Sequence, residues 1–159
     1  MPRIRILAGA LALALSGSAA AAQFDNVIVF GDSLSDNGNL SLAEGLPFAP
    51  SRFTTNPGEV GIEHVADFYG ITLTPSLTGG TDFAFGGAGV VNNSSAGPIP
   101  TLPQQVQTYL AATGGKADPN ALYSVWGGAN DVFYNVALFQ GGAITQDQLQ
   151  ANLQTAAQT

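Results

Sequence analysis

The chain has 159 residues, of which 45% are hydrophobic and 9% are charged, a composition that suits one packed domain and argues against intrinsic disorder. Its formal net charge is −7 with only four Lys and Arg residues, so its surface would repel nucleic acid and anionic lipid headgroups. The absence of cysteine excludes a disulfide framework and a thiolate metal site.

The N-terminal residues predict an export signal. Arg3 and Arg5 give a basic start, an apolar run at 6–15 is too short to span a bilayer, and small residues suited to cleavage follow it. A buried amphipathic helix is the alternative, but no polar face interrupts this segment. We therefore expect a signal peptide at 1–22 and a mature domain at 23–159.

The rest of the chain alternates strand and helix patterns. Strands are predicted at 26–30 and 121–126, and helices at 59–69, 104–112, 131–139 and 145–159. Turn chemistry leading into a first helix is predicted at 35–39, irregular segments at 41–58 and 90–103, and a strand or an extended loop entry at 81–85. This order predicts an α/β fold with a parallel sheet. Two or three strands fall short of the ~5 strands of an average sheet, so we expect the C-terminal part of the fold to lie outside this chain.

A serine stands where the first predicted strand ends. The apolar run Val27–Phe30 is followed by Gly31, Asp32 and Ser33. In a parallel sheet, ligands bind outside the carboxyl ends of the strands, so the Ser33 hydroxyl is placed to face a ligand. A serine nucleophile also needs a general base, a group that orients this base, and hydrogen-bond donors for the oxyanion.

Two later loops can supply such donors. Gly87, in the pair Gly86-Gly87, can offer its backbone N–H because no side chain obstructs the approach, and Asn130 can offer its side-chain amide after the second strand. Taken singly, the glycine pair is explained as a tight turn and Asn130 as a helix cap. The three sites each follow a strand or a strand-like run, and together they favour acyl transfer.

Other motifs fail. The nucleophile elbow of the α/β-hydrolases would need glycine where Ser35 stands. No glycine-rich dinucleotide loop or Walker loop is present in the sequence, so nucleotide binding has no support. Leu34 excludes a calcium loop that starts at Asp32, and we expect Asp32 and Asp36 to orient the turn and to cap the next helix. No metal or other cofactor is expected.

Three blocks of the sequence resemble, in order, those of the GDSL family of serine esterases and lipases, also called SGNH hydrolases. They are Phe30–Asp36, Asp82–Ala88 and Gly128–Asp131. The resemblance covers about residues 24–158 and implies a carboxylic ester hydrolase. It implies Ser33 as the nucleophile, with the Ser33 N–H, Gly87 and Asn130 as oxyanion donors. Gly86 is the alternative to Gly87, and the implied substrate is a small-molecule or lipid ester.

The resemblance also implies a flavodoxin-like, three-layer αβα fold with a parallel sheet in the strand order 2-1-3-4-5. In that order the strand at 121–126 would keep one unpaired apolar edge in this chain, a template for aggregation. One departure from the family is Asp82, because the family usually has asparagine there. That residue would help to hold the loop of the second block.

The family's last block, Asp-x-x-His, is absent from these 159 residues. Their only histidine, His64, falls in the helix predicted at 59–69, and we interpret it as a surface residue of that helix rather than as the base. We therefore expect the N-terminal part of a catalytic domain, with the activating histidine beyond Thr159. The alternative, from another functional class, is a non-catalytic module that binds carbohydrate or lipid surfaces through the same crevice.

Among GDSL proteins, residues 24–30 and 52–57 are most similar to bacterial autotransporter esterases of the outer membrane. In those proteins a C-terminal β-barrel follows the catalytic domain. The similarity points to outer-membrane anchoring through such a barrel, which this chain does not contain. The signal predicts export to the periplasm, the cell surface or the medium.

Overall fold

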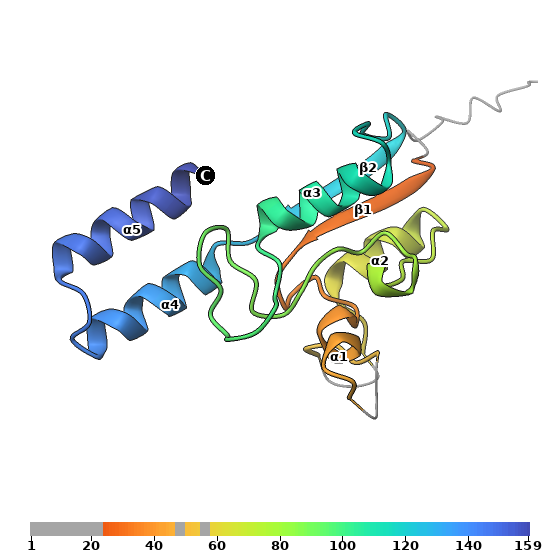
Figure 1. Ribbon diagram of the computed structural model, residues 1–159. Coiled ribbons are helices and arrows are strands. Elements are labelled where there is room, and N and C mark those ends of the chain that lie inside the picture. Colours follow the sequence, from red (N-terminus) through yellow and green to blue (C-terminus); the bar gives the residue numbers. More distant parts are fainter. Residues whose placement is uncertain (1–23, 47–49, 55–57) are drawn as a thin grey trace, which may run out of the picture.

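The computed structural model describes residues 24–46, 50–54 and 58–159 (Figure 1). The export signal predicted at 1–22 therefore lies outside the described residues. None of the helices in the described part of the chain is long and apolar enough to cross a membrane.

Two parallel strands form the regular part of the sheet. They are β1 (Asn26–Gly31) and β2 (Ala121–Trp126), and Val29 lies opposite Ser124 in their register. Both predicted strands are confirmed, and β1 runs one residue further, to Gly31. β1 is buried along almost its whole length, as expected for a central strand of a parallel sheet.

The segment 81–85 runs along the other edge of β1. The Val29 N–H donates to the Thr81 carbonyl oxygen at 3.0 Å, and the Phe83 N–H donates to the Val29 carbonyl oxygen at 2.8 Å. This segment makes only isolated bridges, so it is the extended loop entry of the two predicted alternatives. The order 81–85, β1, β2 agrees with the start of the 2-1-3-4-5 order. Among the described residues, β1 is the only strand that pairs with β2, so the other edge of β2 is open.

The described part of the chain contains five α-helices and one short 3-10 helix (Figure 1). They are α1 (Asn39–Ala43), α2 (Gly61–Phe68), η1 (Ser76–Thr78), α3 (Leu102–Ala112), α4 (Ala129–Gln140) and α5 (Gln146–Gln158). Of these, α2 and α3 pack against β1. Successive β1 side chains point to opposite faces of the sheet. On one face Val27 and Val29 pack with Ala66 of α2, and on the other Phe30 packs with Tyr109 of α3. This three-layer arrangement confirms the predicted α/β class.

Each predicted helix starts at a different residue in the structure: α2 begins at Gly61 rather than at 59, and α5 begins at Gln146 rather than at 145. α3 begins at Leu102 rather than at 104, because Pro103 fits the first turn of a helix, where its missing N–H is not needed. α4 begins at Ala129 rather than at 131, because Gly128 adopts a φ of 102° and lets the chain enter the helix directly after β2. Asn130 therefore lies inside the first turn of α4.

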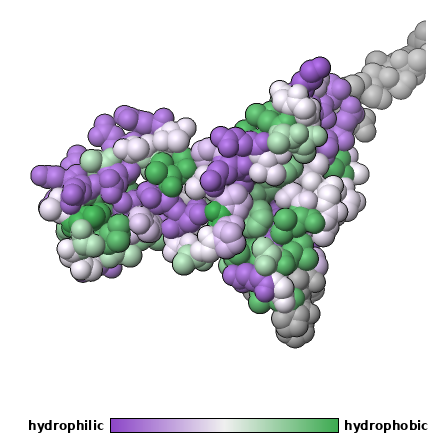
Figure 2. Space-filling model, viewed as in Figure 1, coloured by the Kyte–Doolittle hydropathy of each residue, from purple (hydrophilic) through white to green (hydrophobic). Residues whose placement is uncertain are grey.

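α4 and α5 pack on each other as a helical hairpin that extends away from the sheet (Figure 1). The Gln148 N–H donates to the Thr145 hydroxyl at 3.2 Å, and this bond caps the start of α5. The side chain of Asn152 on α5 donates to Asn135 Oδ1 on α4 at 2.8 Å. Figure 2 shows hydrophobic residues on the visible face both of this hairpin and of the body around the sheet.

The apolar residues of α2 are only partly buried. Ala66 is buried and Ile62 packs against the core, but Val65 is partly exposed and Phe68 is 79% exposed. α2 thus covers the sheet mainly through Ile62 and Ala66, which lie one helical turn apart. The exposed β2 residues Val125 and Trp126 agree with the expected open apolar edge.

Candidate active site

A tight turn follows β1 and presents Ser33. The N–H groups of Ser35 and Asp36 both donate to the Asp32 carbonyl oxygen at 3.0 Å, and the Leu34 N–H donates to Asp32 Oδ1 at 3.0 Å. Asp32 and Ser35 are buried, whereas Ser33 is half-buried. Burial raises the pKa of the Asp32 carboxyl, and the hydrogen bond from Leu34 opposes this effect. Asp32 thus orients the turn, as predicted, and leaves Ser33 accessible to a ligand.

The Asp36 carboxylate joins this turn to two other segments. Its Oδ1 accepts from the N–H groups of Gly38 and Asn39 at 2.8 and 2.6 Å, and its Oδ2 accepts from Leu40 at 3.1 Å. These bonds confirm that Asp36 caps the helix that follows. Its Oδ2 also accepts from the Gly86 N–H at 2.8 Å, a cross-link that sequence spacing does not reveal. Burial raises the pKa of Asp36, opposed by the same four N–H groups.

Asp82 makes a second cross-link between the turn and the glycine loop. Its Oδ2 accepts from the Asn37 N–H at 3.0 Å, and its Oδ1 accepts from the Ala84 N–H at 2.8 Å. The residue is fully buried, and burial raises the pKa of its carboxyl to about 8, with a smaller contribution from Asp36. Asn37 Oδ1 is buried without a partner among the described residues. Asp82 thus holds the loop, the role expected for the residue at this place.

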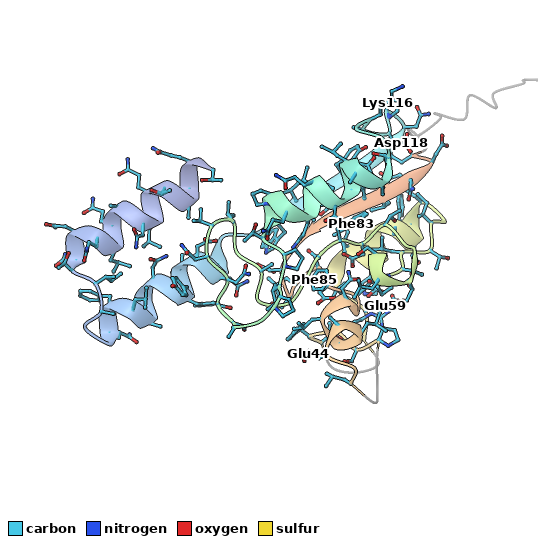
Figure 3. The ribbon with its side chains drawn as sticks, in the orientation of Figure 1. Glu44, Glu59, Phe83, Phe85, Lys116 and Asp118 are labelled. Atoms are coloured by element: carbon cyan, nitrogen blue, oxygen red, sulfur yellow. The ribbon has the colours of Figure 1, made fainter. Side chains whose placement is uncertain are left out.

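Two phenylalanines anchor the segment that carries the glycine loop (Figure 3). Phe83 packs against Phe30 and Tyr109, with ring centroids 5.8 and 5.7 Å apart. Phe85 lies in a cluster with Leu102 of α3. These contacts fix the position of the glycine loop relative to the carboxyl end of β1.

The two glycines of this loop have different environments. The Gly86 N–H is bonded to Asp36, and a Cβ at Gly86 would lie 2.4 Å from the Phe53 ring, so a side chain does not fit there. Gly87 has a φ of 82°, which favours glycine. Among the described residues, the Gly87 N–H has no hydrogen-bond acceptor. Gly87 therefore has a donor to offer, and Gly86 does not.

The side chain of Asn130 is buried and fixed in one orientation. Its Oδ1 accepts from the Ser94 hydroxyl at 2.6 Å, and its Nδ2 donates to the Ala88 carbonyl oxygen at 2.8 Å. The second N–H of this amide has no acceptor in the described part of the chain. Gly128, and not Asn130, occupies the cap position of α4, so the helix-cap explanation of Asn130 was wrong.

Asp131 ties α4 to the loop after the glycines. Its carboxylate is fully buried and accepts from the N–H groups of Val90, Val91 and Asn92 at 2.7, 2.8 and 2.7 Å. The sequence predicted only a favourable acid at the start of a helix. The loop anchor could not be found from spacing, because the partners lie about 40 positions earlier in the chain.

These bonds connect all three predicted site residues. Asp36 and Asp82 hold the Ser33 turn against the Gly86-Gly87 loop, and Asn130 holds the same loop one residue further on, at Ala88. The loops gather at the carboxyl ends of the parallel strands, the edge where ligands bind in open α/β sheets.

His64 does not join this group. It is exposed on α2, and its Nδ1 lies 3.2 Å from Glu59 Oε2. No hydrogen bond connects it with Ser33 among the described residues. Glu59, His64 and Asp67 bring one potential metal-ligand atom each within 4.8 Å of one another, all on exposed side chains. The structure agrees with the interpretation of His64 as a surface residue.

Comparison with known families adds to this geometry. Residues 27–159 match the model of the GDSL-like lipase/acylhydrolase family. The chain belongs to this family. Membership gives it the SGNH-hydrolase fold, a three-layer α/β architecture with a parallel sheet that agrees with the strands and helices described above.

A lipase relative is much longer than this GDSL-family chain. Over 129 residues the chain is 37% identical to Lipase 1 of Photorhabdus luminescens. The match covers 78% of this chain and 18% of the relative, so the chain spans about a fifth of the length of that protein.

The buried Asp82 predicts a specific dependence of stability on pH. Its raised pKa means that the native state keeps a proton that the unfolded chain releases, so this stabilisation is complete below about pH 4 and is lost as pH rises toward about 8. In that window the free energy of unfolding should fall by up to about 1.4 kcal/mol per pH unit through this group. Asp82→Asn should remove this slope, as measured by urea unfolding of the full-length protein across the pH range.

Asp147→Asn is the matched control, because Asp147 is an exposed carboxylate in the first turn of α5. Its unfolding curve should keep the wild-type slope. If Asp82→Asn also kept that slope, the buried carboxyl would be ionised at neutral pH and the account of Asp82 would be wrong.

Loss of the Asp131 anchor should loosen the loop at 90–92. Asp131→Ala removes one acceptor from three amides and should lower the free energy of unfolding by about 3 kcal/mol, because hydrogen bonds to a charged group contribute roughly 1.5–3 kcal/mol each and part of this is regained from water. The amides of Val90, Val91 and Asn92 should exchange faster with deuterium. Equal exchange in Asp131→Ala and in the exposed-site control Asp147→Ala would contradict the anchor.

Proposed function

We propose that this chain contributes the nucleophile and the oxyanion hole of an ester hydrolase. The observation that carries the proposal is a set of N–H groups without acceptors among the described residues: the backbone N–H of Ser33, that of Gly87, and one N–H of the Asn130 amide. All three belong to segments held together by Asp36, Asp82 and the bond from Asn130 to the glycine loop. Membership of the GDSL-like lipase/acylhydrolase family supports the same reaction class.

In the proposed reaction, Ser33 Oγ attacks the acyl carbon of a small-molecule or lipid ester. The hydroxyl proton passes to a general base, and the negative charge moves to the former carbonyl oxygen. Gly87, Asn130 and the Ser33 amide would donate to this oxygen. The alcohol then leaves with a proton, and water releases the acid from the acyl-serine. Each donor aimed at a developing oxyanion contributes about 3–4 kcal/mol to transition-state stabilisation.

The general base of this proposal lies outside these 159 residues. The only histidine of the chain is His64, which is exposed and paired with Glu59. The lipase relative is about five times as long as the matched part, so a base from further along a longer protein is consistent with the comparison. The activity therefore belongs, in this proposal, to the full-length protein.

Export is a further part of the proposal. It is supported by the basic start and the short apolar run within residues 1–22. Anchoring to the outer membrane is supported only by the similarity of residues 24–30 and 52–57 to autotransporter esterases, and it stays a prediction. A cell-fractionation experiment with an antibody to the mature domain would separate periplasmic, surface and secreted protein.

The proposed roles predict graded losses of activity. In the full-length protein, Ser33→Ala should abolish hydrolysis of p-nitrophenyl butyrate, because no other group takes the place of the nucleophile. Asn130→Ala should lower kcat by roughly 10²–10³-fold, the usual loss for one oxyanion donor. Asn120→Ala is the matched control and should leave kcat unchanged, since Asn120 is exposed at the opposite end of β2.

Turnover that survives Ser33→Ala would contradict the proposal. A full-length protein that binds lipid vesicles or polysaccharide, without any esterase activity, would instead favour the non-catalytic binding module. Equal effects of Asn130→Ala and Asn120→Ala would remove the oxyanion role of Asn130.

A further inference from the structure

The segment 51–54 is held in place by its polar neighbours. The Ser51 N–H donates to the Ser41 hydroxyl at 2.7 Å, which ties the segment to α1. The Arg52 guanidinium makes a bidentate ion pair with Glu63 of α2. Glu63 is buried and also accepts from the Val60 N–H at 2.9 Å, so the pair is itself fixed at the start of α2. The chain at Arg52 is therefore anchored to both helices.

Phe53 stands inside this anchored segment, yet its side chain is 54% exposed. Single exposed apolar residues are common on protein surfaces and need no explanation by themselves. Two observations set Phe53 apart. Its backbone is fixed through Arg52, and its ring lies directly against the backbone of Gly86, where an added Cβ would be only 2.4 Å from Cε2 and Cζ of the ring.

Gly86 places the ring next to the proposed reaction centre. It immediately precedes Gly87, the proposed oxyanion donor, and its own N–H is bonded to Asp36 in the turn that presents Ser33. The Phe53 ring therefore contacts the residue next to Gly87, whose N–H is proposed to bind the ester oxygen.

A groove extends from this ring toward α1. Its volume is about 220 Å³, and its apolar lining comes from Leu40, Leu46 and Phe53. Leu40 also lies against Gly86, with Cδ2 2.9 Å from the position of an added Cβ. The rest of the lining is polar and comes from Ser41, Glu44, Ser51 and Arg52. Glu44 directly follows the last residue of α1 (Figure 3). A hydrocarbon chain would contact the apolar part of this lining.

We infer that Phe53 lines the binding groove for the acyl chain of the ester and thereby sets the preference for acyl length. The inference rests on the proposed function, because it takes Ser33 and Gly87 as the groups that meet the ester carbonyl. Contact with the Phe53 ring removes apolar surface of the acyl chain from water, so longer acyl chains gain more from it than acetate does.

A second apolar hollow provides the competing site. It has a volume of about 280 Å³ and is lined by Leu34, Ile62, Val65 and Trp126, among others. It lies on the α2 side of the turn, at the open edge of β2. The atoms nearest to a Cβ added at Gly86 belong to Phe53 and Leu40, and neither residue lines this hollow.

The test compares kcat/KM for p-nitrophenyl acetate and p-nitrophenyl octanoate in the full-length protein. Phe53→Ala should lower the octanoate-to-acetate ratio at least about tenfold, because several methylene groups lose an apolar partner. Phe53→Leu should restore most of the ratio. Phe68→Ala is the matched control and should keep the wild-type ratio. The Phe68 ring is more exposed, lies at the end of α2 and makes an edge-to-face contact with Tyr69.

Thermal unfolding of each variant distinguishes specificity from a fold defect. A purely structural role of Phe53 would lower activity on both esters equally, and this outcome would overturn the inference. A ratio that shifts in Trp126→Ala but not in Phe53→Ala would place the acyl chain in the other hollow and would also overturn it. Ser33→Ala tests the proposed function separately, since full activity in that variant would refute the nucleophile whatever the acyl preference shows.

Discussion

The candidate site depends on buried carboxylates that accept hydrogen bonds from backbone N–H groups. A strand, a turn and two loops from distant parts of the chain converge at one edge of the sheet, and their backbones carry N–H groups that must find partners away from water. Asp36, Asp82 and Asp131 provide these partners between segments, each with two or more bonds. The position of Ser33 relative to Gly87 follows from this network.

Within the described residues, this network leaves some N–H groups without an acceptor. Gly86 and Gly87 are neighbours, but only the Gly86 amide is used by Asp36. The amide of Asn130 is held by Ser94 and Ala88, with one N–H left over. A donor that is fixed by the fold before the substrate arrives costs no reorganisation during the reaction, which is the property an oxyanion hole requires. The same carboxylates that satisfy the framework thus decide which amides stay available.

Much of the fold could be predicted from sequence, because β1 and β2 are short apolar runs that end at glycines, and α5 starts at a capping threonine. The three site residues could also be located, since each follows a strand or strand-like run. The long-range bonds could not. Nothing in the spacing joins Asp36 to Gly86, or Asp131 to Val91, because such pairs depend on how separate loops meet in space. For the same reason the choice between Gly86 and Gly87 was left open, and the contact between Phe53 and Gly86 was not foreseen.

The central claim is that Ser33 is the acyl nucleophile, and covalent labelling tests it most directly. The full-length protein would be treated with an alkyl fluorophosphonate, which phosphonylates activated serine hydroxyls, and the labelled peptide would be located by mass spectrometry. The account predicts one adduct, on Ser33, and loss of esterase activity in proportion to labelling. An adduct on another residue, such as the buried Ser35, or an active enzyme that takes up no label at Ser33, would contradict it.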